Sequence, residues 1–425
     1  MFSNLKKLFN SNNKDLRKRI YFTLFVLLIF GFGTNIIVPG AKQITSNLGF
    51  LDLLSLMSGG TLKTFSIFAL GVMPYITATI LTQLLQMDII PYFKELKEQG
   101  ATGRQKINKI NRYLGILFSF IQGYIYAVAF MGGDTLTIIK TTVILTAGTA
   151  LLLWLADQIT KKGLGNGISL IIMAGIVNTL PSTFTTAFND LVIADTFTKT
   201  VGIILYILFI LAYLFILVGV VYTELAERRI PIQHSTRTIS SYAKEQSYMP
   251  LKLNSANVMP VIFASALTSV PSLIAGVISN EAFKNFVNNY IVYTSLTGFI
   301  LYMVLIFAFG YVYSLMELNP KDMSENLDKS RAYIPGIAPG LRTQDYLKGT
   351  ITRLTVVGSA CLAILAAVPI LFTKLSGLSS SVTLGGTGLL IVVGVALETY
   401  KQLESSIVSR SYDDERKRRH NRWGI

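Results

Sequence analysis

The side chains that most often carry chemistry are scarce in this chain. Histidine occurs only at His234 and His420, so no Cys/His or His/carboxylate set of the kind that holds a metal is expected. The single cysteine, Cys361, has no partner within the chain and is expected to pack inside a helix. The segment GATGRQK, residues 100–106, lacks the spacing of a phosphate-binding loop. The sequence therefore predicts no metal, no cofactor and no nucleotide chemistry.

The composition instead indicates a membrane protein. The 425 residues are 51% hydrophobic and 14% charged, whereas a soluble protein has about 25% charged residues. A helix needs about 20 apolar residues to cross the hydrocarbon layer. Ten uncharged stretches have or approach this length: 20–41, 64–87, 113–133, 141–156, 163–189, 200–223, 253–280, 285–316, 354–373 and 375–397. We therefore predict an all-α polytopic membrane protein with ten transmembrane helices.

Ionisable residues are missing from the depth of these stretches. Asp157 and Arg353 lie at their edges. Proton relays and ion-coupled transporters place such residues inside the membrane, and a hydrolase there needs a nucleophile beside a base. The sequence therefore predicts that the chain is not an enzyme, and it disfavours the main rival class, a secondary transporter for a small solute.

The basic residues predict the orientation. Counting spans places every one of the 38 Lys and Arg residues on one side except Lys42, Lys63, Lys140, Lys199, Lys284 and Lys374. The basic side is cytoplasmic by the positive-inside rule, so both termini are expected there. This rule accounts for most of the net charge of +15, and contacts with anionic lipid or nucleic acid remain open for the rest.

Ten spans divide into two sets of five, which must have opposite orientations and typically form a site at their interface. The predicted divisions are a cytoplasmic segment at 1–19, an N-terminal half with spans 1–5 at 20–189, span 6 with a first large cytoplasmic loop at 190–252, spans 7–10 with a second large loop (about 317–349) at 253–400, and a basic cytoplasmic tail at 401–425.

The segment SGGTLKTFSIFALGVMPYITATILTQLL, residues 58–85, is an irregular span. Its front half contains Gly59, Gly60 and Lys63, and its back half is uncharged with Ile76 and Ile80 one helical turn apart. Irregular backbone at membrane depth is tolerated only where protein or a water-filled cavity satisfies its polar groups. We expect this segment to line or close a cavity.

The two large loops contain stiff and apolar residues among their arginines. In the first loop, alternation over residues 230–241 predicts a β-hairpin. In the second, YIPGIAPG, residues 333–340, predicts a rigid exposed tip because proline restricts φ and glycine permits turns. Both loops suit docking of a partner, and the alternative is that they are solvated connectors.

Further segments point to a family. GLGNGISLIIMAGIV (163–177) and GGTGLLIVV (385–393) combine small residues, which let helices approach closely, with isoleucine. Together with residues 58–85, ERRIP (227–231), PLKLNSANVMPVIFAS (250–265) and YIPGIAPG, they resemble the SecY family in order and spacing. This family forms the central subunit of the bacterial protein-conducting channel, and the resemblance covers all ten spans and both large loops.

The resemblance implies two inverted five-helix halves around a central hourglass pore with a re-entrant plug helix. Unfolded polypeptides with a signal sequence would cross the membrane through this pore, and transmembrane segments would leave it sideways into lipid. Such a channel has no energy source of its own, so a partner motor or the ribosome drives it. A hydrophobic constriction gates by dewetting, so a ring of isoleucines resists ions without binding the passing peptide.

The resemblance also assigns residues. The implied pore ring is Ile76, Ile80, Ile172, Ile176, Ile262 and Ile391. The implied plug lies at about 50–64 and includes Leu51, Leu54, Leu56, Ser58, Gly59 and Gly60. The implied lateral gate, which polar groups would close weakly between spans 2 and 7, includes Thr82, Gln83, Asn257, Ser265 and Thr268. The implied docking surface includes Arg228, Arg229, Arg237, Arg331, Tyr333, Pro335, Gly336 and Arg342.

The implied partners are SecE-like and possibly SecG-like membrane subunits, the SecA ATPase or the ribosome, signal sequences and lipid, in the bacterial cytoplasmic membrane. Two positions depart from the family. Ala338 stands in the second loop, and Phe32 precedes the glycine of span 1, where the family usually has arginine. The docking role of that loop arginine is therefore not transferred to Ala338, and an accessory paralogue remains an alternative to the main channel.

Overall fold

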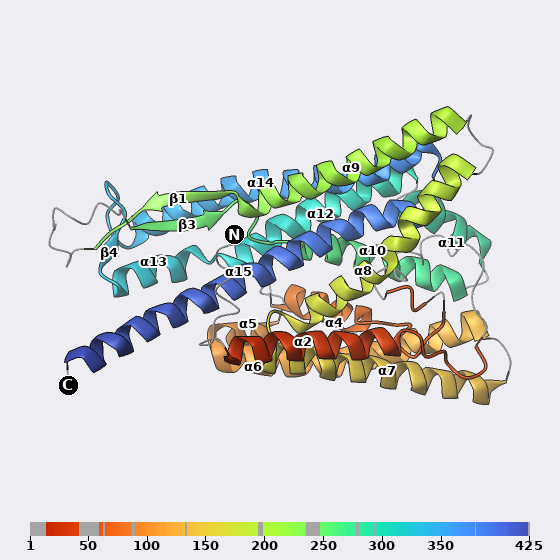
Figure 1. Ribbon diagram of the computed structural model, residues 1–425, viewed down its shortest axis with the longest axis horizontal. Helices are drawn as coiled ribbons and strands as arrows, with labels where there is room; N and C mark the ends of the chain where they lie inside the picture. Colours follow the sequence, from red (N-terminus) through yellow and green to blue (C-terminus); the bar gives the residue numbers. More distant parts are fainter. Residues whose placement is uncertain are drawn as a thin grey trace.

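The computed structural model describes residues 14–41, 59–62, 64–86, 90–131, 134–193, 199–234, 247–277, 280–292, 295–378 and 380–423. Nearly all of this chain is helical, and the long helices run side by side along the long axis of the molecule (Figure 1). The short strands and helix α13 project beyond the bundle at one end (Figure 1).

The described part of the N-terminal half contains six α-helices and two π-helical turns. They are α2 (Lys14–Gly33), α4 (Met73–Leu85), α5 (Pro91–Glu98), α6 (Ala101–Tyr126) continued by η2 (Ala127–Met131), α7 (Thr135–Lys162), and α8 (Gly167–Phe188) continued by η3 (Asn189–Ile193). Residues 163–166 separate α7 from α8. Asn166 caps α8, since its side-chain oxygen accepts a hydrogen bond from the Ile168 N–H at 3.1 Å.

The C-terminal half contains the longest helices. Its elements are α9 (Lys199–Leu225), α10 (Met259–Val277), α11 (Glu281–Phe286) continued by η4 (Val287–Ile291), α12 (Leu296–Glu317), α13 (Pro320–Lys329), α14 (Leu341–Ser376) and α15 (Ser380–Trp423). α14 and α15 extend well past their apolar portions. α14 links the bundle to the projecting end, whereas α15 runs out of the bundle toward the C-terminus (Figure 1).

Each of the ten predicted stretches contains a helix: α2, α4, α6, α7, α8, α9, α10, α12, α14 and α15. By length and composition, six helices of the described residues can cross a membrane, and Met73–Leu85 and Met259–Ser272 are shorter apolar helices. The fold is therefore that of a polytopic helical membrane protein, and the count of ten spans stays a prediction.

The irregular segment ahead of α4 is folded back into the protein. Residues 64–72 form turns, with Phe65 and Gly71 at positive φ. The Val38 N–H donates to the Phe65 carbonyl at 3.0 Å, and the Thr61 hydroxyl donates to the Phe68 carbonyl at 2.9 Å. Protein atoms thus satisfy these polar groups, which is one of the two conditions that permit irregular backbone at membrane depth.

The two large loops are joined by strands. β1 (Glu227–Pro231) pairs antiparallel with β3 (Tyr248–Lys252), and β2 (Gln233–His234) of the first loop pairs with β4 (Ala332–Tyr333) of the second. A separate hydrophobic cluster lies beneath them: Ile230, Leu251, Leu327, Ala332, Ile334, Leu347 and Ile351. Residues 235–241 of the hairpin expected at 230–241 lie outside the described residues. Within the described residues, 227–231 pairs with 248–252, and this register buries Ile230 and Leu251 together.

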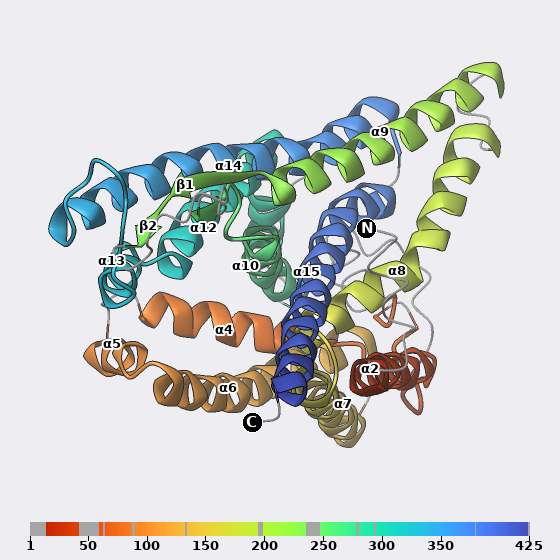
Figure 2. The ribbon, with the colours of Figure 1, turned by 60° about the vertical axis from the view of Figure 1, so that its left-hand side comes forward.

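Several pairs of elements join the two halves. α4 contacts α10 and α8 contacts α15, and in addition α10 contacts α6 and η2 and α9 contacts η3. In Figure 2, α2, α4, α6 and α7 lie on one side of the molecule and α9, α10, α12 and α14 on the other, with α8 and α15 between them. One continuous hydrophobic cluster contains residues of both halves, so the interface between the halves is apolar.

Candidate functional site: an apolar cluster between the two halves

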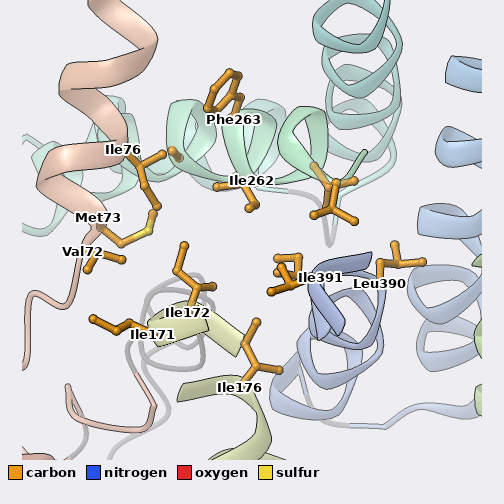
Figure 3. Close-up of a cluster of buried hydrophobic side chains, with 14 of the residues drawn as sticks. Val72, Met73, Ile76, Ile171, Ile172, Ile176, Ile262, Phe263, Leu390 and Ile391 are labelled. Carbon is orange, nitrogen blue, oxygen red and sulfur yellow. The ribbon is translucent and has the colours of Figure 1, made fainter. Parts of the chain in front are cut away.

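The six isoleucines predicted as a ring lie in one cluster. Ile76 and Ile80 come from α4, Ile172 and Ile176 from α8, Ile262 from α10 and Ile391 from α15. Each is only 1–6% exposed. Figure 3 shows five of them (all but Ile80) pointing toward a common centre from four helices. Both halves therefore contribute isoleucine side chains to the same buried place.

Small residues allow this convergence. Gly388 of α15 packs directly on Ile176, since a Cβ at that glycine would lie 2.8 Å from Ile176 Cγ2. Gly167, at the start of α8, lies against the Ala156 carbonyl of α7, where a Cβ would approach the oxygen to 1.9 Å. α8 is thereby held close to α7 and α15, and its isoleucines are fixed between them.

Sequence reasoning missed other members of the cluster. Val72 and Met73 lie about one turn before Ile76, and Met73 points toward the same centre (Figure 3). Ile171 and Leu390, each adjacent to a predicted residue, are also buried there. The i−3 and i−4 positions relative to Ile76 are the signal that identifies Val72 and Met73.

The six isoleucines and their neighbours Val72, Met73, Ile171 and Leu390 are all apolar, and none of them is titratable. Within the described ranges, no group of three or more His, Cys, Asp or Glu residues is placed to hold a metal ion. Asp157, at the edge of a predicted span, forms an ion pair with Arg112 of α6, with 2.5 Å between the oxygen and the nitrogen. The arrangement can exclude water and ions from the interface, and it offers no group for acid–base or nucleophilic chemistry.

The trailing end of the predicted plug rests on α8. Leu51, Leu54, Leu56 and Ser58 lie outside the described residues, whereas Gly59 and Gly60 lie inside them. The Asn178 side chain donates a hydrogen bond to the Gly59 carbonyl at 3.3 Å. Gly59 also packs on Gly175, where a Cβ would lie 3.0 Å from the Gly175 Cα. Asn178 was not predicted, although a polar residue near Ile176 in an apolar span is a usable signal.

A small cavity separates the halves beside the cluster. It has a volume of about 20 Å³ and is lined by Ile80, Gln83, Leu84, Phe263, Phe309, Val312, Tyr313 and Met316. These residues come from α4, α10 and α12. Gln83 is thus the predicted gate residue that faces the opposite half, and its neighbours there are mostly apolar and aromatic.

The other predicted gate residues have partners within their own half. The buried Thr82 hydroxyl bonds to Asn111 Oδ1 of α6 at 2.5 Å, and the Ser265 hydroxyl lies 3.1 Å from the Tyr302 hydroxyl of α12. Thr268 donates to the Ala264 carbonyl one turn earlier, and Asn257 lies in the turn before α10. The expected polar closure between the halves is therefore not made by these hydroxyls, because nearer acceptors compete for them.

The described docking residues gather at the projecting end (Figure 1). Arg228, Pro335, Gly336 and Arg342 are exposed. The Tyr333 hydroxyl donates to Gln233 Oε1 at 3.0 Å, which links the two loops. Arg237 lies outside the described residues, and Arg331, at φ 52°, is exposed beside β4.

Arg229 is already engaged within the protein. Its Nε lies 2.8 Å from Glu227 Oε1, and its guanidinium carbon lies 4.8 Å from the centre of the Tyr248 ring. Both neighbours belong to the β1–β3 pair, so Arg229 presents a fixed rather than a freely moving charge.

The fold and the site together define a polytopic helical membrane protein whose two halves enclose an apolar, uncharged interior. Residues 66–400, more than half of the chain, match the family model for SecY. The chain belongs to the SecY family, whose members are channel subunits rather than enzymes.

Named relatives agree in length as well as sequence. The protein translocase subunit SecY of Staphylococcus epidermidis is 41% identical over 427 aligned positions, which cover 97% of this chain and 99% of that protein. The protein translocase subunit SecY of Bacillus subtilis is 42% identical over 413 positions, which cover 94% and 96%.

Solved structures support the fold. A structure of a protein-conducting channel superposes with a TM-score of 0.68 at 23% identity and covers 93% of each chain. The Sec61 protein in a canine ribosome–channel complex from the endoplasmic reticulum superposes with a TM-score of 0.65 at 22% identity and also covers 93% of each. At these identities the likeness concerns the fold alone.

Proposed function

We propose that this chain is the channel subunit that translocates unfolded, signal-bearing polypeptides across the bacterial cytoplasmic membrane and releases transmembrane segments sideways into it. One observation carries the proposal. Six isoleucines from both halves converge in one buried cluster without a charge (Figure 3). Branched apolar side chains repel ions by dewetting and can still rearrange around an extended peptide.

The plug and the gate follow from the surroundings of this cluster. We assign the stretch of about 50–64 as the plug, supported by the docking of Gly59 on α8 near Ile176. We assign the lateral gate to the α4–α10 contact, supported by the cavity between α4, α10 and α12. A signal sequence is an apolar helix, so it would displace the apolar packing around Gln83 and then meet lipid.

The partners are inferred from the charge and exposure of the projecting end. With both termini cytoplasmic, the exposed Arg228 and Arg342 face the cytoplasm, where a SecA-type ATPase or a ribosome would bind. The canine Sec61 relative in the fold comparison is part of a ribosome–channel complex. SecE-like and possibly SecG-like membrane subunits would clamp the two halves from the lipid side.

Reconstituted translocation tests this function. The chain is placed in proteoliposomes with its membrane subunits, a SecA-type ATPase and ATP, and precursor is scored by protection from added protease. We expect protection of a precursor with an intact signal sequence and none when a charge interrupts the apolar core of that signal. Equal protection of both precursors, or of neither, would contradict the proposal.

A further inference from the structure

The turn that precedes α10, residues 253–258, packs closely against three helices of its own half. The Leu253 N–H donates to the Ala226 carbonyl just beyond α9, at 2.9 Å. Gly358 of α14 lies against the Leu253 carbonyl, where a Cβ would approach the oxygen to 2.2 Å. Gly394 of α15 lies against Val258, where a Cβ would be 2.4 Å from Val258 Cγ1. A side chain at Gly358 would displace the backbone of the turn, and one at Gly394 would displace the Val258 side chain.

A buried carboxylate organises this turn. Glu224, at the end of α9, is 4% exposed, and its Oε1 accepts a hydrogen bond from Asn254 Nδ2 at 2.6 Å. The same Asn254 amide donates to the Asn257 carbonyl at 2.9 Å. Asn257 has φ 51°, a left-handed conformation that asparagine tolerates better than most residues. The carboxylate and one amide therefore fix the turn in a backbone conformation it would not otherwise favour.

Lys401 of α15 also contacts the end of α9, beside the turn. Lys401 Nζ donates to the Glu224 carbonyl at 2.9 Å, which satisfies one of the carbonyls left unpaired at the end of α9. Burial, and then the nearby Lys252, lower the pKa of Lys401. The Lys401 ammonium group lies here although burial and Lys252 disfavour its charge. Its hydrogen bond joins α15 to the end of α9 and, through Glu224, to the turn.

The rest of α10 is held differently. Five residues after Asn257, Ile262 enters the isoleucine cluster, and Phe263 lines the small cavity that faces α4. The contact of α10 with the opposite half is apolar packing beside an unfilled space. One end of α10 is thus fixed by hydrogen bonds and close backbone contacts, and the portion that meets α4 is not.

We propose that Glu224 and Asn254 are positioning residues for the lateral gate. They fix the cytoplasmic end of α10, so that the helix swings about this turn when it separates from α4. The inference rests on the assignment of the gate to the α4–α10 contact. It adds that the hydrogen bonds of Glu224 and Asn254, which lie outside the gate, set the position of α10 in the closed channel.

The test uses a cysteine pair across the cavity in the full chain with its membrane subunits. Cys361→Ser removes the native thiol, and Gln83→Cys with Phe263→Cys supplies one thiol on each half. The yield with a short bifunctional thiol reagent is measured with and without an engaged precursor. Without precursor, Glu224→Leu is expected to shift the equilibrium about fivefold from the closed toward the open gate, the change that one net hydrogen bond makes, and so to lower the yield.

Two matched variants separate positioning from general loss of structure. Glu224→Gln keeps an oxygen that accepts from Asn254 and is expected to restore the yield. Glu325→Leu removes an exposed carboxylate of α13, which pairs with Lys329 of the same helix, and is expected to leave the yield unchanged. If Glu224→Leu does not accumulate in the membrane, Asn254→Ala takes its place with the same expected loss.

The outcomes test separately the assignment of the gate and the positioning role of Glu224 and Asn254. If the cysteine pair alone gives the same yield with and without precursor, the assignment of the gate is wrong. If that yield falls on precursor engagement but the Glu224 or Asn254 variant behaves like its parent, the gate stands and the positioning role is refuted.

Discussion

The proposed seal consists of branched apolar side chains. Replacing one of them with an amide side chain tests it. Ile172 of α8 is 2% exposed and points into the cluster (Figure 3). Asparagine in its place would attract water to a constriction that otherwise repels it. A hydration gain of about 1–2 kcal/mol should raise the resting ion conductance in planar bilayers about tenfold. Ile172→Val, which keeps the branch, should leave the conductance near its original value; a leak of equal size in both variants would contradict the seal.

Gln83 is the polar residue that faces the apolar cavity of the gate. Replacing it with leucine would extend the apolar contact with Phe263 and Phe309. Because a signal sequence must displace that contact, we expect Gln83→Leu to reduce export of a weak-signal precursor several-fold and to spare a strong-signal one. Gln86→Leu is the matched control, since the Gln86 amide bonds to the Thr82 carbonyl of its own helix. Unaltered export of the weak-signal precursor in Gln83→Leu would refute this role.

At the residue level, the six isoleucines were assigned from the resemblance of their surrounding motifs to the SecY family. The structure brings all six into one cluster, and their role as a pore ring stays a prediction. The partners of Thr82 and Ser265 were not predicted, because Asn111 and Tyr302 are 29 and 37 residues away. A hydroxyl in an apolar span can bond to its own helix, a neighbouring helix or the opposite half, and the local sequence does not distinguish these.

Among the structural elements, the irregular segment before α4 includes the described end of the proposed plug. Its described end contacts α8 through the hydrogen bond from Asn178 to Gly59. Asn178→Ala removes this bond, so we expect the plug to leave more readily and the resting conductance to rise, although less than on deletion of residues 52–62. Thr185→Ala, on the same helix with its hydroxyl bonded to the Ser182 carbonyl, should leave the conductance unchanged. No rise on deletion of 52–62 would contradict the plug assignment itself.

Helices were easier to predict than strands. Long uncharged stretches specify helices in a membrane because every backbone group must be satisfied internally. Most of the hairpin expected at 230–241 lies outside the described residues, and the strand that the structure describes there, β1, pairs with β3. The actual register depends on Leu251 and on residues of the second loop, which bury Ile230 in a shared cluster. Such long-range pairing is not encoded in the local pattern.

At the scale of the whole molecule, two halves share one apolar interface and one projecting end. Span counting predicted the two halves, and charge predicted which end is cytoplasmic. The joining of both large loops by β2 and β4 was not foreseen, because the two strands are almost a hundred residues apart and only two residues long. A partner that binds one loop would therefore also move the other.

The central claim is that polypeptides pass through the isoleucine cluster. Site-specific photocrosslinking of an arrested, signal-bearing precursor tests it most directly, with the probe placed in turn at Ile76, Ile262 and Ile391. The account predicts crosslinks to the mature part of the precursor from all three positions, and none from a probe at Phe215, which is 62% exposed on the outer face of α9. Crosslinks at Phe215 with none at the three isoleucines would contradict it.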